Sequence, residues 1–254
     1  MMNLNEVSKQ LKEMGYETKV ISVIKNGIEM PCISVKQTDN ASVCLYEKNI
    51  KGKTLDEIIE MCNQSLSFNP KEITLEFILN NVMIGVQANG TENLIKRKTN
   101  FDGIEKYLYV NITDELSFKL KENDFKELDR NDLWKKAEDN TYNSAIIMTI
   151  EDFMNGNKGE PISNVVSVDP YFTVVKNETC FRGAGIITIK KVVDKLKSLM
   201  NAKEMFVIPS SIHECIVMRK EDGMDINDIK EMVLAVNASE VSDEDKLIDN
   251  AYII

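Results

Sequence analysis

The sequence predicts an α+β fold with mostly antiparallel sheets and packed amphipathic helices. Three apolar runs rich in β-branched residues cluster near the N-terminus, at 19–24, 28–35 and 41–46. Later strand-like runs are interspersed with helical patterns, without the regular alternation that is typical of a doubly wound parallel sheet. The 254 residues, 43% hydrophobic and 28% charged, suffice for one large domain or two small ones.

The N-terminal region begins with a short amphipathic helix. Its apolar residues recur at helical spacing, namely Leu4, Val7, Leu11 and Met14. The Asn-Gly pair at 26–27 predicts a hairpin between the first two strands, because this pair readily adopts positive φ. Thr54 and Glu57 have the spacing of a capping box, so a helix is expected to begin there. Another helix is expected after Pro70, to about residue 80.

The middle of the chain alternates apolar runs with one helical pattern. Strands are predicted at 82–87, 106–112, 116–120 and 144–150. Between the last two, an interrupted helix is expected over 122–138, with Asn131 as an N-cap. The segment 155–161, with two Gly, two Asn and a Pro, is the best linker candidate and divides the chain into regions 1–154 and 162–254.

The C-terminal region continues the mixed pattern. Strands are predicted at 171–175, 205–208, 212–218 and 247–254, and a helix at 188–200. A last helix is expected from Asp225, with the buried stripe Ile226, Ile229, Val233 and Val236.

Composition excludes several classes of protein. No stretch approaches the ~20 apolar residues of a membrane span, and the N-terminus lacks the basic and apolar regions of a signal peptide. The odd number of widely spread cysteines, each among apolar residues, is typical of reduced core thiols: Cys32, Cys44, Cys62, Cys180 and Cys215. We therefore expect a cytoplasmic protein. No cofactor or metal pattern is present.

Acidic residues concentrate near the C-terminus. Ten carboxylates and two lysines lie within 221–249, so this segment carries eight of the ten net negative charges. Such a surface repels nucleic-acid phosphates and anionic membranes. It is either a solvated helix face or a surface offered to a basic partner. The candidate partner-binding residues are Glu221, Asp222, Asp225, Asp228, Glu231, Asp243, Glu244 and Asp245.

The single histidine lies in a turn with other reactive side chains. The candidate functional turn comprises Ser210, Ser211, His213 and Glu214. If 212–218 is a strand, His213 and Cys215 project side by side from one face, and Glu214 points to the other. This arrangement argues against a Cys–His dyad. A histidine that hydrogen-bonds the turn at 209–211 is the structural alternative, and binding of a ligand or partner is the functional one.

The chain resembles domain of unknown function family 5688. The resemblance rests mainly on Phe-Val-Ile-Pro-Ser-Ser-Ile-His-Glu at 206–214, Gly-Ala-Gly at 183–185 and Val-Asn-Ala-Ser-Glu-Val at 236–241. The segments 28–59 and 132–140 fit more loosely. The family has no established activity, and the resemblance implies a bacterial or phage cytosol and a mobile-element setting.

Two functional hypotheses remain. The first is a non-enzymatic protein-binding accessory protein of a phage or bacterial mobile element, such as an anti-CRISPR or anti-restriction inhibitor. Its partner would be a host protein, for example a basic nucleic-acid enzyme, bound through the acidic surface. The alternative is a small hydrolase or transferase with a site around Ser211, His213 and Cys215. The sequence does not fix the oligomeric state.

Overall fold

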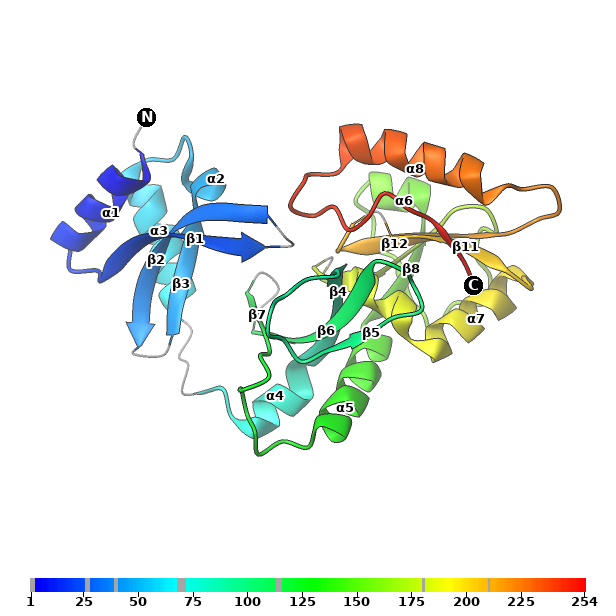
Figure 1. Ribbon diagram of the computed structural model, residues 1–254, viewed down its shortest axis with the longest axis horizontal. Coiled ribbons are helices and arrows are strands. Elements are labelled where there is room, and N and C mark those ends of the chain that lie inside the picture. The colour runs from blue at the N-terminus through cyan, green and yellow to red at the C-terminus, as the bar shows by residue number, and fades with distance from the viewer. Residues whose placement is uncertain are drawn as a thin grey trace. The chain divides into compact units, whose positions relative to one another are not determined.

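The computed structural model describes residues 3–25, 28–38, 41–67, 72–112, 116–179, 181–209 and 211–254. The chain divides into two compact units, residues 1–74 and 75–254. Antiparallel sheets and packed helices make up both units (Figure 1), which confirms the α+β fold. None of the helices in these described ranges is long and apolar enough to cross a membrane.

The first unit is a three-stranded antiparallel sheet packed against helices. Its elements are α1 (Leu4–Glu13), β1 (Thr18–Lys25), β2 (Ile28–Thr38), β3 (Ala41–Tyr46), α2 (Glu47–Ile50) and α3 (Leu55–Leu66). The strands pair in the order β1-β2-β3, with Lys25 opposite Ile28. The predicted hairpin strands are therefore confirmed, while the Asn26-Gly27 turn itself lies outside the described residues. Thr54 and Glu57 form the predicted capping box of α3.

The second unit begins with a four-stranded sheet. Its elements are α4 (Leu75–Asn81), β4 (Val82–Ala88), β5 (Lys96–Lys98), β6 (Ile104–Asn111), β7 (Ser117–Lys119) and α5 (Arg130–Asn143). The order is β4-β6-β5, and β7 also pairs with β6. The predicted interrupted helix over 122–138 is wrong in its first part, since α5 begins only after Asp129. Asp129 rather than Asn131 is the N-cap, because its carboxylate accepts from the backbone N–H groups of Asn131 and Asp132.

A six-stranded antiparallel sheet completes the second unit. Its strands are β8 (Ala145–Thr149), β9 (Glu160–Pro161), β10 (Thr173–Asn177), β11 (Met205–Ile208), β12 (Glu214–Arg219) and β13 (Tyr252–Ile253). They follow the order β13-β11-β12-β10-β8-β9. The segment 155–161 lies inside this unit, and the strands on its two sides, β8 and β10, pair with each other.

Helices cover both faces of the six-stranded sheet. They are α6 (Ile150–Met154), the 3₁₀ helix η2 (Gly183–Thr188), α7 (Lys190–Met200) and α8 (Ile226–Glu240). Phe206, Ile208 and Met218 pack under α8, while the alternate residue Cys215 contacts η2 on the opposite face. Figure 1 shows α8 and α7 on the two sides of β11 and β12.

A close backbone contact joins η2 to the edge strand β4. A Cβ atom at Gly185 would lie 2.0 Å from the carbonyl oxygen of Ile84, so only glycine fits there. The Gly-Ala-Gly segment therefore serves close packing, and it lacks the further residues of a complete phosphate-binding motif.

The buried side of α8 differs from the prediction in one residue. Ile226, Ile229 and Val233 face the core, but Val236 is 47% exposed. Asn237 takes its place and is 2% exposed. Its amide nitrogen donates to Ile248 O and to Asp249 Oδ1, at 3.3 and 2.9 Å, so the buried N–H groups are satisfied, while Oδ1 has no hydrogen-bond partner among the described residues.

Candidate functional site

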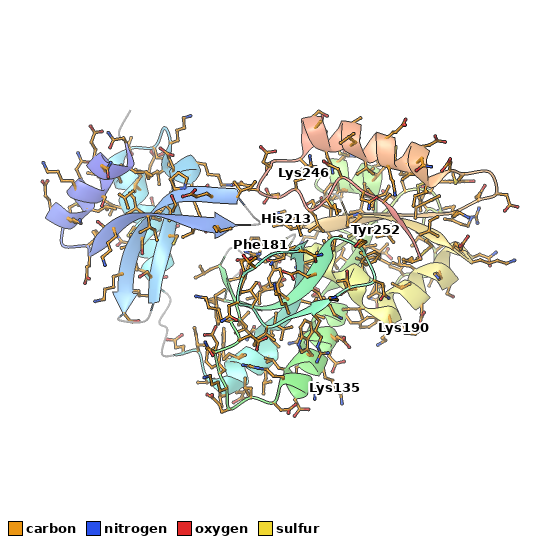
Figure 2. The ribbon with its side chains drawn as sticks, viewed as in Figure 1. Lys135, Phe181, Lys190, His213, Lys246 and Tyr252 are labelled. Atoms are coloured by element: carbon orange, nitrogen blue, oxygen red, sulfur yellow. The ribbon has the colours of Figure 1, made fainter. Side chains whose placement is uncertain are left out.

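The candidate turn lies just before β12, an inner strand of the six-stranded sheet. Ser211 and His213 precede the strand, which begins at Glu214, so His213 is not a strand residue as predicted. Ser210 lies outside the described residues. The side chains of His213 and Phe181 are labelled in Figure 2, and their rings lie 5.8 Å apart.

Both nitrogens of the His213 imidazole are engaged. Nδ1 accepts a hydrogen bond from the backbone N–H of Arg182 at 3.2 Å. Nε2 lies 3.1 Å from Oδ1 of Asp245. Because Nδ1 acts as an acceptor, the neutral ring carries its proton on Nε2 and donates it to Asp245. The imidazole of His213 therefore bonds two other segments, and it is the backbone N–H of His213 that bonds the turn at 209–211.

Backbone and hydroxyl contacts complete this arrangement. Ser211 Oγ accepts from the backbone N–H of His213 at 2.9 Å, and Ile212 N–H donates to the carbonyl oxygen of Asp245 at 2.8 Å. Three segments distant in sequence thus meet at one point. We call Arg182, Ser211, His213 and Asp245 the His213 junction.

Glu214 alternates with Cys215 along β12, so it lies on the face of the sheet that α8 covers. It lies opposite Lys176 of β10 in the antiparallel register. Burial raises the pKa of the Glu214 carboxyl, against the opposing influence of His213, a Ser211 hydrogen bond and Lys176. The ionised carboxylate is therefore disfavoured in the folded state.

Cys215 does not form a nucleophilic pair with His213. Its side chain is 1% exposed, and the Sγ–H donates to the carbonyl oxygen of Ala184 at 3.7 Å. Burial raises the pKa of the thiol, so a reactive thiolate is suppressed. Ser211 is bonded to a backbone N–H, and both imidazole nitrogens have other partners. These three residues therefore do not form a nucleophile–base pair.

The acidic candidates divide into structural and exposed groups. Glu221 forms an ion pair with Arg219 at 2.5 Å, Asp225 caps α8, and Asp245 belongs to the His213 junction. Glu244 is half-buried. The remaining candidates are exposed, and they are Asp222, Asp228, Glu231 and Asp243.

A second polar cluster was missed by the sequence analysis. In β6, Glu105, Tyr107 and Tyr109 alternate on the sheet face opposite α5. Gln87 lies opposite Glu105, and Lys119 lies opposite Tyr109. We call these five residues the tyrosine face. The signal was the period-2 placement of polar residues in an otherwise apolar strand.

The guanidinium of Arg182 lies at the tyrosine face. Its carbon is 5.9 Å from the ring centroids of both Tyr107 and Tyr109, and Nη1 donates to the Tyr107 hydroxyl. The His213 junction holds the backbone of the same residue. Arg182 therefore connects the candidate turn to the tyrosine face.

Two other kinds of site, a metal site and a ligand groove, are less well supported by the structure. Among the residues that the structure describes, no group of three His, Cys, Asp or Glu side chains could hold a metal ion. A surface groove of about 540 Å³ lies between α5 and α7, lined by Lys136, Tyr142, Lys190 and Lys191 among others. It has both lysines and carboxylates in its walls and shares no residue with the His213 junction.

Comparison with known proteins gives one match. The sequence model of a family described as a family of unknown function (DUF5688) matches residues 118–253. The matched range contains α5, the six-stranded sheet, Arg182 and the rest of the His213 junction, whereas the loosely similar segment 28–59 lies outside it. No curated protein and no solved structure matches the chain.

Proposed function

Because the chain belongs to DUF5688, a family of unknown function, we propose its function from the surface of α8 rather than from the family. The chain is, on this proposal, a non-enzymatic accessory protein that binds a basic partner protein through α8. The contacts of His213 and Cys215 favour binding over the hydrolase or transferase alternative. The observation that carries the proposal is the row of exposed apolar and acidic residues on this helix.

The exposed side of α8 carries residues that the fold does not use. Asp228, Met232, Val236 and Glu240 follow one another at intervals of four residues, so they form a row along the helix surface. Met232 is 39% exposed and Val236 is 47% exposed. An apolar centre is thus flanked by a carboxylate at each end. With Glu231, these residues form what we call the α8 face. Leu234, which is 55% exposed, lies two positions from both Met232 and Val236 and so projects from another side of the helix.

Packing against the sheet does not account for the α8 face. The side of α8 toward the core is already filled by Ile226, Ile229, Val233 and Asn237. A single exposed apolar residue is ordinary, but Met232 and Val236 are neighbours at i, i+4 on one side of the helix, and burial of that helix does not require them. An amphipathic partner would cover them and bring cations to the carboxylates.

The charge of the region selects the class of partner. The segment 221–249 carries a net charge of −8, from ten carboxylates and two lysines. This field repels nucleic acids and anionic membranes and attracts basic proteins. Complementary charge chiefly raises the association rate and makes the complex sensitive to salt.

A finer version of the proposal names the partner. A nucleic-acid enzyme presents a basic groove built for phosphates, and an acidic helix with an apolar row can occupy such a groove. A host defence nuclease would then be the target, and the chain would act as a counter-defence protein of a phage or mobile element, in the manner of an anti-CRISPR or anti-restriction inhibitor.

The test uses the full chain as bait in bacterial lysate, at low and at high salt, with quantitative mass spectrometry. One variant carries Asp228→Lys and Glu231→Lys. The matched control carries Asp56→Lys and Glu60→Lys, which make the same charge change on the exposed side of α3. The proposal is supported if the wild type and the control retain a single basic protein that high salt releases and that the α8 variant does not retain.

Two results would contradict it. Retention that is equal in the α8 variant and the control would place the partner elsewhere on the surface. Binding of the purified partner that is unchanged by Met232→Ser and Val236→Ser would show that the apolar row contributes nothing, because burial of two such side chains should be worth about 1–3 kcal/mol each.

A further inference from the structure

The backbone of Arg182 adopts a conformation that is unusual for its residue type. Its φ is 57°, in the left-handed region that non-glycine residues rarely occupy. The N–H bond to His213 holds this conformation in place. The next residue must be glycine, because a Cβ at Gly183 would lie 2.5 Å from the carbonyl oxygen of His213. Such locally disfavoured backbone persists where the surrounding structure enforces it, and functional sites are enriched in it.

The side chain of Arg182 lies among aromatic rings and has unused donors. Its guanidinium carbon is 5.0 Å from the Phe181 ring and 5.9 Å from the rings of Tyr107 and Tyr109. Only Nη1 is hydrogen-bonded to a described residue, the Tyr107 hydroxyl. The buried Nε–H has no acceptor among the residues that the structure describes. A guanidinium has five N–H donors, so most of its capacity remains available.

Two neighbouring lysines each have an ion-pair partner, whereas Arg182 has no ion-pair partner among the described residues. Lys119 pairs with Glu92 at 3.0 Å, and Lys96 pairs with Glu105 at 3.0 Å. Within the described ranges, no carboxylate lies within 4.0 Å of Arg182. These five side chains therefore carry a net charge of +1. A partly buried cation without a counter-ion is unfavourable unless an anion or strong acceptor joins it.

Tyr107 offers a second donor at the same place. Its hydroxyl accepts from Arg182, and its own proton has no acceptor among the described atoms. Burial raises the pKa of this phenol, so the hydroxyl stays protonated at neutral pH. The Lys119 ammonium lies 4.9 Å from the same ring, which adds positive potential beside it.

We propose that Arg182 and Tyr107 form an anion-binding site for a phosphoryl or carboxylate group carried by a small ligand. The guanidinium supplies charge-assisted hydrogen bonds in a fixed fork, and Lys119 strengthens the field. The His213 junction positions Arg182 through its backbone. This site is separate from the α8 face and does not depend on the function proposed for that helix.

The experiment is titration calorimetry of the full chain with inorganic phosphate and, separately, with acetate, at constant ionic strength set by chloride. We expect saturable binding of at least one anion in the millimolar range or tighter. Arg182→Gln should weaken that binding by about tenfold or more, since charge-assisted hydrogen bonds are lost. Saturation by phosphate alone assigns a phosphoryl ligand, and saturation by acetate alone assigns a carboxylate.

Arg97→Gln is the matched control. Arg97 also stacks on an aromatic ring, Trp134, at 4.6 Å, but it lies on the opposite face of the same sheet. Its substitution should leave the affinity unchanged. If Arg182→Gln does not fold, Tyr107→Phe removes only the hydroxyl and should still weaken binding several-fold.

Three results would overturn the proposal. They are the absence of saturable binding by the folded wild type with both anions, equal affinities in the wild type and Arg182→Gln, and equal losses in Arg182→Gln and Arg97→Gln. The last result would reflect the overall charge of the protein rather than a site.

Discussion

Replacing His213 by alanine should destabilise the second unit. The substitution leaves the backbone N–H of Arg182 without its acceptor and removes the imidazole donor to Oδ1 of Asp245. A neutral hydrogen bond contributes about 0.5–1.5 kcal/mol, and one to a charged group about 1.5–3 kcal/mol. The His213 and Asp245 side chains are only 22% and 29% exposed, so solvent weakens the hydrogen bond to the carboxylate only in part. The free energy of unfolding should therefore fall by about 2–4 kcal/mol.

The chain contains its own probe for this measurement. Trp134 is the only tryptophan, it is 3% exposed, and it lies on α5 in the second unit. Urea unfolding followed by its fluorescence therefore reports this unit and not the first one. Circular dichroism reports the unfolding of both units, so the loss of stability should appear in only one of the two unfolding transitions.

Two conservative variants separate the roles of the two imidazole nitrogens. His213→Asn keeps an acceptor near the position of Nδ1, and His213→Gln keeps a donor near Nε2. Each should be more stable than His213→Ala. A change below about 0.5 kcal/mol in His213→Ala would refute the reasoning, because that is the size of an ordinary surface substitution.

Three further predictions concern the same unit. Glu214→Gln should raise the urea midpoint at neutral pH. The pKa of Glu214 is raised in the folded state, so its stabilising contribution is present below the unfolded pKa of about 4.3 and is lost as the pH rises through the folded pKa. The gain from Glu214→Gln should therefore vanish in urea titrations near pH 4. Cys215 should resist alkylation in the native protein and react only on unfolding, as measured by peptide mass spectrometry; rapid native labelling would revive a catalytic role for this thiol. Gly185→Ala should cost about 1–3 kcal/mol or more because its Cβ would overlap the carbonyl oxygen of Ile84, while Gly90→Ala, whose nearest contact would be 3.7 Å, should be nearly neutral in the same thermal melts.

Local signals in the sequence predicted most of the elements. The capping box at Thr54, the hairpin strands and the start of α8 at Asp225 depend on residues within a few positions of one another, so the sequence contains the whole signal. The errors arose where adjacent residues compete. Asp129 and Asn131 are both good caps, and the choice between them depends on where the preceding turns end.

Tertiary hydrogen bonds account for what the sequence did not predict. An apolar pattern selects Val236 for the core, but Asn237 is buried because Asp249 and a backbone carbonyl accept from its amide. In the same way, 31 positions separate His213 from Arg182, and nothing local links either residue to Asp245. The candidate histidine was identified by being the only one, whereas Arg182 carries no local signal at all.

The bond between His213 and Asp245 has a thermodynamic consequence. Asp245 lies in the segment that directly follows α8, so the backbone connects its carboxylate to the proposed partner-binding helix. A partner that shifts this segment on docking changes the support under Arg182, and so changes its affinity for an anion. Linkage makes such an effect reciprocal: the anion must then alter the affinity for the partner by the same factor. Measured together, the two affinities would give a single coupling free energy for the molecule.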